Sequence, residues 1–256
     1  MHDHLVSYLR SALSNAADGS YTFQLLSDEE IAAIDREVES DLSLQPWIDA
    51  NNLNVRECAR FGERSLFLRG LLEPSDEATD DGIRLRASDA LQLVADVRRL
   101  CDAHLMARSA HGGVRTGRYL TVQSRAGAFE ESVDAEGMHV FTACTHGVAV
   151  ERLAEWALPI VSHAGVPVNG RIPVERWNTW VINELGVSAR QVEVLLFLPD
   201  ATGAIGAESW LVAHANGIGV IAFPDGGQQL RISAITRERL SELILDRVAG
   251  ALPLEP

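Results

Sequence analysis

In the first 100 residues, apolar side chains recur mainly every three or four positions, which is typical of amphipathic helices. Ser27-Asp28-Glu29-Glu30 has the sequence of a capping box, and Ile31, Ile34 and Val38 follow it at helical spacing. The pattern predicts a strand at residues 21–26, an acidic turn at 74–82, and helices at 5–13, 27–38, from Pro46 onward, 55–72 and 88–100.

Beyond residue 100 the apolar period changes to 2, the period of a β-strand. This pattern predicts strands at residues 104–109, 117–124, 129–133 and 138–144, followed by a helix at 148–157. The same order then returns, with a helix at 174–185, strands at 192–198, 209–215, 218–223 and 229–233, and a final helix capped by Thr236. Both closing helices end in Ala-Leu-Pro, which suggests a divergent duplication.

The repeated order predicts an α+β fold of two pseudo-symmetric lobes, each an antiparallel meander of about four strands with flanking helices. We divide the chain accordingly into an N-terminal extension at residues 1–20, a first α+β lobe at 21–159 and a second α+β lobe at 160–256. The division rests on the order of elements rather than on matching residues.

Composition narrows the possible functions. The 256 residues are 46% hydrophobic, enough for a sizeable core, and their formal net charge is −14. Such a charge argues against sequence-independent binding of nucleic acid and against binding to anionic membranes. All 22 basic residues are arginine, which excludes catalysis by lysine and indicates a GC-rich, actinobacterial type of genome.

The cysteines and the N-terminus favour a cytoplasmic protein. Cys58, Cys101 and Cys144 lie far apart and form no Cys-x-x-Cys pair, so we expect reduced thiols. The sequence shows no signal peptide, and no apolar run approaches the length of a transmembrane helix.

Catalytic and metal-binding motifs are missing from the sequence. His104, His111, His139, His146 and Cys144 fall on the first meander, but their spacing matches no zinc motif. There is neither a Gly-x-Ser-x-Gly elbow nor a dinucleotide fingerprint. We therefore expect no enzyme activity, no cofactor and no metal.

Paired carboxylates do not change this expectation. Glu130 and Glu131 are neighbours on a predicted strand, so their side chains point to opposite faces and cannot flank one bond.

Two other functions remain as alternatives. The helix at 55–72 and the segment at 82–85 resemble the recognition helix and wing of a winged-helix regulator, with Arg56, Arg60, Arg64 and Arg69 toward phosphates. Acidic residues surround these arginines, which disfavours DNA. An acidic, immunity-like inhibitor that caps a toxin would instead present an acidic face from residues 28–41.

Three segments carry a resemblance to a known family. Residues 25–30 look like an opening strand and helix, residues 64–72 like a helix ending in L-x-x-x-G-L-L before the helix at 87–100, and residues 210–219 with 231–245 like closing strands and a final helix. In these the chain resembles the EspG family, chaperones of type VII (ESX) secretion. Residues 1–19 have no obvious counterpart in that family.

The resemblance implies a cytoplasmic, non-enzymatic chaperone or adaptor. Such a protein binds a helical secreted partner, such as a PE–PPE-like heterodimer, and keeps it soluble without a cofactor. Packing of a helix into a groove, assisted by a loop of a meander, is the implied mode of recognition. By position, the expected partner-binding residues are Ser124, Arg125, Ala126 and Gly127 in one loop, together with Trp210 and Leu211.

Overall fold

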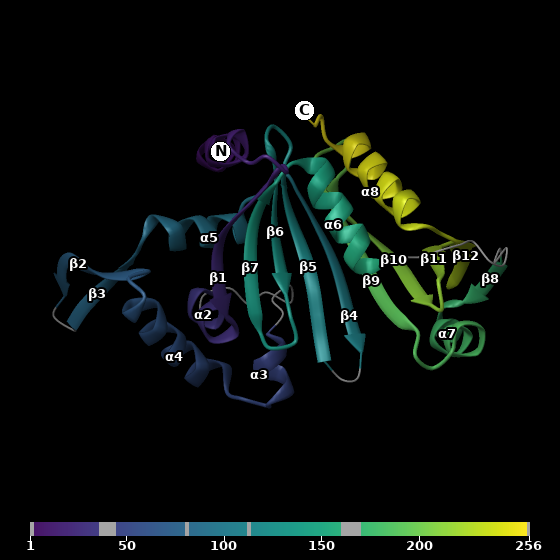
Figure 1. Cartoon of the computed structure of the whole chain (residues 1–256), viewed down its shortest axis with the longest axis horizontal. Coiled ribbons are helices and arrows are strands. Elements are labelled where there is room, and N and C mark those ends of the chain that lie inside the picture. Colours follow the sequence, from purple (N-terminus) through teal and green to yellow (C-terminus); the bar gives the residue numbers. More distant parts are fainter. Residues whose placement is uncertain (1–2, 36–44, 80–81, 112–113, 160–169, 255–256) are drawn as a thin grey trace.

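The computed structural model describes residues 3–35, 45–79, 82–111, 114–159 and 170–254. Ten strands form one antiparallel sheet in the order β1-β7-β6-β5-β4-β9-β10-β11-β12-β8 (Figure 1). The first half of this sheet contains β1 (Ser20–Ser27), β4 (Ala103–His111), β5 (Val114–Gln123), β6 (Gly127–Val133) and β7 (Met138–Cys144). The second half contains β8 (Gly170–Pro173), β9 (Arg190–Pro199), β10 (Ile205–Ala215), β11 (Ile218–Pro224) and β12 (Gln229–Ala234).

The two halves have the same topology and meet where β4 pairs with β9. His104 to Arg108 lie opposite Phe197 to Glu193, so the two predicted meanders share one continuous sheet. Outward from this junction, each half runs through a four-strand meander and ends in the strand that precedes it in the chain. The predicted α+β fold is confirmed. The division of the chain at residues 20 and 159 stays a prediction.

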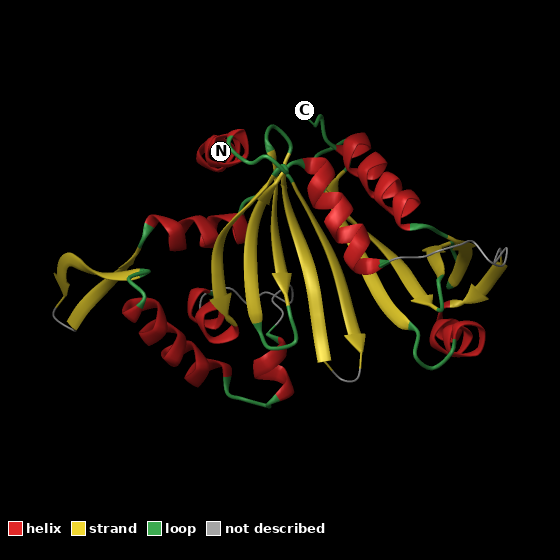
Figure 2. Ribbon diagram, in the orientation of Figure 1, coloured by secondary structure: helices red, strands yellow, loops and turns green. Residues whose placement is uncertain are grey.

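One face of the sheet packs against α6 (His146–Ala157) and α8 (Arg237–Ala251), which lie side by side in Figure 2. Because side chains alternate along a strand, neighbouring residues serve different cores. Ile221 belongs to the core under α6 and α8, whereas Val220 and Ala222 belong to the core under α7 (Trp177–Leu185) on the opposite face. A 3₁₀ turn, Val174–Arg176, leads into α7.

The opposite face of the first half is covered by the helices that precede β4. These are α1 (Asp3–Ser14), α2 (Asp28–Ile34), α3 (Pro46–Ala50), α4 (Val55–Leu68) and α5 (Asp89–Arg99). The predicted capping box at the start of α2 is present, with Ser27 and Glu30 each bonded to the other's backbone N–H. Val38, expected on the same helix, lies outside the described residues.

Two predictions in the segment from 55 to 87 are wrong. The helix predicted to reach residue 72 ends at Leu68, because Gly70 adopts a left-handed conformation (φ +69°). The N–H groups of Gly70 and Leu71 then bond back to the carbonyls of Phe67 and Leu66, which is a Schellman motif. The acidic segment predicted as a turn forms a separate hairpin of β2 (Leu72–Thr79) and β3 (Gly82–Ala87).

Candidate functional site

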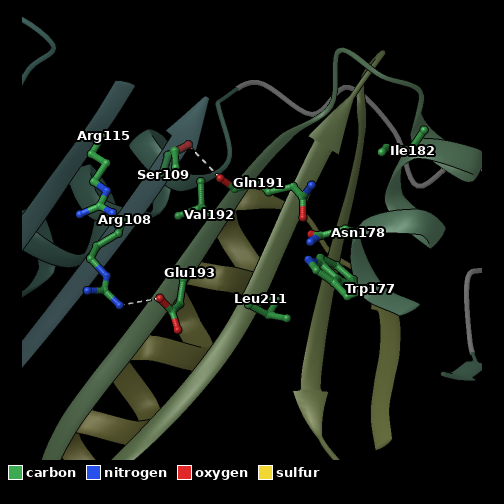
Figure 3. A pocket seen from close by; sticks show the side chains of 11 residues that line it. Arg108, Ser109, Arg115, Trp177, Asn178, Ile182, Gln191, Val192, Glu193 and Leu211 are labelled. Atoms are coloured by element: carbon green, nitrogen blue, oxygen red, sulfur yellow. Dashed lines mark hydrogen bonds and ion pairs between the residues drawn. The ribbon is translucent and has the colours of Figure 1, made fainter. Parts of the chain in front are cut away.

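A cavity of about 750 Å³ lies on the sheet where β4 and β9 meet, next to α7 (Figure 3). It is lined from β4, β5, α7, β9 and β10 by Arg108, Ser109, Ala110, Arg115, Trp177, Asn178, Ile182, Gln191, Val192, Glu193 and Leu211. The helices of the first half cover one side of this face and α7 covers the other. The cavity therefore opens between the two coverings, at the centre of the pseudo-symmetric sheet.

The polar side chains at the floor of the cavity are paired across the junction. Arg108 and Glu193 form an ion pair at 2.7 Å, and the Ser109 hydroxyl donates to the Gln191 carbonyl at 2.8 Å (Figure 3). These contacts fix the floor. Ser109 has no histidine among its lining neighbours, so the lining residues do not form a nucleophile–base pair.

Apart from Asn178, the side chains that line the cavity from α7 are apolar, and the helix is firmly held. The Trp177 ring stacks on that of Trp180, with centroids 5.8 Å apart, and Trp177 itself is buried. Ile182, one turn and a half further along α7, is 47% exposed. Leu211 reaches the same cavity from β10. A wall of apolar side chains beside charged groups suits a protein segment with both kinds of side chain.

The loop expected to bind a partner lies elsewhere, at the opposite end of β5 from Arg115. Its Arg125 pairs with Asp3 at 2.5 Å, and Arg10 donates to the Arg125 carbonyl at 2.9 Å, so α1 packs beside the loop. Ser124 is buried and bonds to Asp102. Ala126 packs partly buried against the core beneath α1.

Gly127, the last residue of that loop, marks a close approach between strands. It adopts φ +142°, and a Cβ there would lie 2.4 Å from the Cys144 carbonyl oxygen. Of the residues from 124 to 127, only Arg125 is strongly exposed.

Trp210 and Leu211 point to opposite faces of the sheet. Trp210 is 5% exposed and packs edge to face on Phe223 in the core under α6 and α8. Leu211 lines the cavity. The six expected residues therefore do not form one site, and of the two on β10 it is Leu211 that a ligand in the cavity would touch.

A network of buried ionic groups lies under the first-half helices. His139 on β7 lies between two carboxylates, with Nε2 2.8 Å from Asp28 Oδ1 and Nδ1 2.6 Å from Glu131 Oε1. Arg98 on α5 pairs with Glu131 and, at 2.7 Å, with Asp35. Asp28 also accepts the backbone N–H groups of α3 at Trp47 and Ile48. The network thus ties α2, α3 and α5 to the sheet.

Burial and pairing act in opposite directions on the groups of this network. Burial disfavours the charged forms, but hydrogen bonds to Asp28 and Glu131 outweigh it and raise the pKa of His139. Burial likewise opposes ionisation of Glu131, yet Arg98 and His139 lower its pKa to about 2. His104 lacks such partners, and burial lowers its pKa to about 4.

The arrangement of His139 between two carboxylates is similar to that of an acid–base triad, but this histidine is not placed to act as a general base. His139 is 0% exposed, and both ring nitrogens are bonded to carboxylates. A general base must reach a substrate. The network therefore holds helices in place.

The described residues contain neither a metal-ion cluster nor a helix that could span a membrane. In that part of the chain, no three His, Cys, Asp or Glu side chains are grouped to hold a metal ion. None of the helices there combines the length and apolar character needed to cross a bilayer.

The sequence interpretation missed most of the cavity. Arg108 and Glu193 are charged residues within the strands predicted at 104–109 and 192–198, and such charged positions are a usable signal. Trp177 and Trp180 are three residues apart in the sequence, a spacing that places both on one helix face but indicates no cavity. What the sequence did not indicate is that these residues, on three elements, lie around one opening.

Comparisons with known proteins define the fold. No family model matches the sequence, and no curated protein matches it. Among solved structures, the chain is similar to the type VII secretion chaperone EspG5 of Mycobacterium tuberculosis, solved in complex with the PE25–PPE41 dimer. The match has a TM-score of 0.51 at 12% identity and covers 91% of this chain and 98% of that chain. The protein thus has an EspG-like fold along nearly its whole length.

Proposed function

We propose that this protein is a cytoplasmic, non-enzymatic chaperone that binds a helical secreted protein, of the kind of a PE–PPE heterodimer, and keeps it soluble. The observation that carries the proposal is the open cavity between β4 and α7, with an apolar wall and a paired, charged floor. The EspG-like fold supports it, because the neighbour with this fold is a chaperone in complex with such a dimer.

In this proposal the apolar end of the partner packs against Ile182 and Leu211. Arg115, on the far side of the cavity, is largely exposed and pairs loosely with Asp49 at 3.8 Å, so it is available to a carboxylate of the partner. Burial of a few apolar side chains in such a pocket supplies most of the affinity of many interfaces.

The test is affinity purification from the native host with matched surface variants. We expect wild type to retain a small helical secreted protein, and Ile182→Glu to lose it by placing a charge against the apolar end. Val187 lies just beyond α7 and is strongly exposed. The control variant Val187→Glu should therefore retain the partner. Co-expression should keep that partner in the soluble fraction with wild type and leave it insoluble with Ile182→Glu.

Other results would refute the proposal. Equal retention of the partner by wild type and by Ile182→Glu would exclude the cavity as the partner-binding site. Recovery of DNA would favour the winged-helix alternative, and recovery of a toxin the immunity-like one. The structure weakens the immunity-like alternative, because Asp28 and Glu30 are buried in ionic contacts instead of forming an acidic face.

A further inference from the structure

A second surface, far from the cavity, is formed by the outward side of α4 (Figure 1). The inner side of this helix is buried at Cys58, Ala59, Gly62 and Leu66. On the outer side, Phe61 is 69% exposed and Leu68 is 74% exposed, while Phe67 is nearly half exposed. Apolar side chains this exposed on one helix mark an interaction surface more often than scattered ones do.

The helix that presents these side chains is held rigidly. At Gly62 a Cβ would lie 1.9 Å from the Glu29 carbonyl oxygen, so α4 crosses α2 at backbone contact. Glu30 of α2 accepts from Ser65 at 2.7 Å and from Arg69 at 2.5 Å. The outward face is therefore a fixed surface and needs no ordering before a partner binds.

Positive charge lies beside the apolar side chains. Arg56, Arg60 and Arg64 are four residues apart and follow one stripe of the helix, which continues to Phe67. None of the three forms an ion pair with a described residue, in a chain whose net charge is −14. The acidic residues of α4 are Glu57, at its first turn, and Glu63, between Arg60 and Arg64 in the sequence.

We propose that this face of α4 docks an amphipathic helix of a partner protein whose apolar side covers Phe61 and Leu68 and whose acidic flank pairs with Arg60 and Arg64. Charge complementarity identifies the occupant, because three unpaired arginines beside an apolar stripe match a helix with Asp or Glu next to its apolar side. This site does not depend on the proposed function of the cavity.

Nucleic acid and anionic membrane are weaker candidates for the same arginines. DNA phosphates leave Phe61 and Leu68 exposed, and Glu73 and other acidic residues of the segment 73–81 follow α4 directly in the chain. A membrane surface accepts apolar side chains, but the overall negative charge opposes its anionic headgroups.

The test is selection from a displayed library of amphipathic helices, in which the positions flanking a fixed leucine stripe are Glu or Lys at equal frequency. We expect selection on the full chain to enrich Glu at these positions. The selected peptide should bind at least tenfold more weakly to Arg60→Gln/Arg64→Gln and to Phe61→Ser/Leu68→Ser. Its affinity should fall with salt.

Matched variants separate this site from general charge effects and from the cavity. Arg237→Gln/Arg239→Gln removes two arginines of α8 that already have acidic neighbours, and it should leave binding unchanged. Ile182→Glu should also leave it unchanged, so failure here and failure of the proposed function are distinguishable. Enrichment of Lys, no enrichment, or equal binding by the α4 variants would overturn the proposal. So would tighter, α4-dependent binding of a 20-base-pair duplex or of phosphatidylserine vesicles.

Discussion

β6 and β11 occupy equivalent places, each being the third strand from the β4–β9 junction, yet their central residues differ in kind. In β11 the centre is Ile221 and Ala222, both buried and apolar. In β6 the centre is Glu130 and Glu131, which are also buried but ionic. As the alternation of a strand requires, the two carboxylates serve opposite faces. Glu131 pairs with Arg98 under α5, and Glu130 pairs with Arg118 and with Arg152 of α6.

This difference extends over the two halves. The buried polar and charged side chains of the described chain all lie between residues 28 and 142, within the first half and its helices. The second half docks α7 through an apolar cluster. Since an ion pair has a fixed geometry and apolar packing tolerates sliding, the first half uses charge to set the places of several short helices.

Breaking the network gives the largest expected effect. Glu131→Ala leaves Arg98 buried without its main partner, and this should lower the free energy of unfolding by about 3–5 kcal/mol. The matched deletion in the second half is Glu208→Ala, which removes an exposed ion pair with Arg247 and should cost less than about 1 kcal/mol. Urea denaturation of the three proteins measures both values. Equal losses would show that the network carries no special share of the stability.

The pH dependence of stability should follow His139. Its pKa is raised in the folded chain above the ordinary value of 6.5, so folding is favoured by the bound proton. This contribution is complete below pH 6.5 and is lost as the pH rises through the folded-state pKa, by at most about 1.4 kcal/mol per pH unit. Denaturation of wild type and His139→Gln between pH 6 and pH 9 tests it. The two curves should converge as the pH rises; a constant difference would contradict the assignment.

At acidic pH the dependence of stability on pH has the opposite sign, so stability falls as the pH falls. The pKa of Glu131 falls from 4.5 to about 2 on folding, so its contribution is present above pH 4.5 and is lost as the pH falls toward 2. His104, with its pKa lowered to about 4, adds a loss between pH 6.5 and pH 4. His104→Phe should remove that second loss and leave the first.

The sequence predicted the elements of both halves better than their assembly. Alternating apolar residues place β7 at residues 138–144, and the capping box locates the start of α2. Pairing of His104 with Phe197 joins residues more than 90 positions apart, and no local pattern encodes it. The hairpin of β2 and β3 was missed because Pro74 and a run of acidic residues disfavour a strand.

The candidate site was predicted less well for the same reason. Alternation shows that Trp210 and Leu211 face opposite ways, but it does not show which face the helices leave open. The ion pair of Arg108 with Glu193 spans 85 positions. The loop at Ser124 was expected to bind a partner, whereas α1, whose docking the sequence did not reveal, packs against it.

The smallest expected effect is also the sharpest test of the comparison, because it removes the same group from each half. Ile31 packs in the first-half core under α2, and Ile232 packs under α7; both are buried. Ile→Val at either position deletes one methylene and should cost about 0.5–1.5 kcal/mol. If charge alone distinguishes the halves, the two losses will agree with each other and stay constant from pH 5 to pH 9. A pH-dependent loss at Ile31 would show that apolar packing and the ionic network in the first half are coupled.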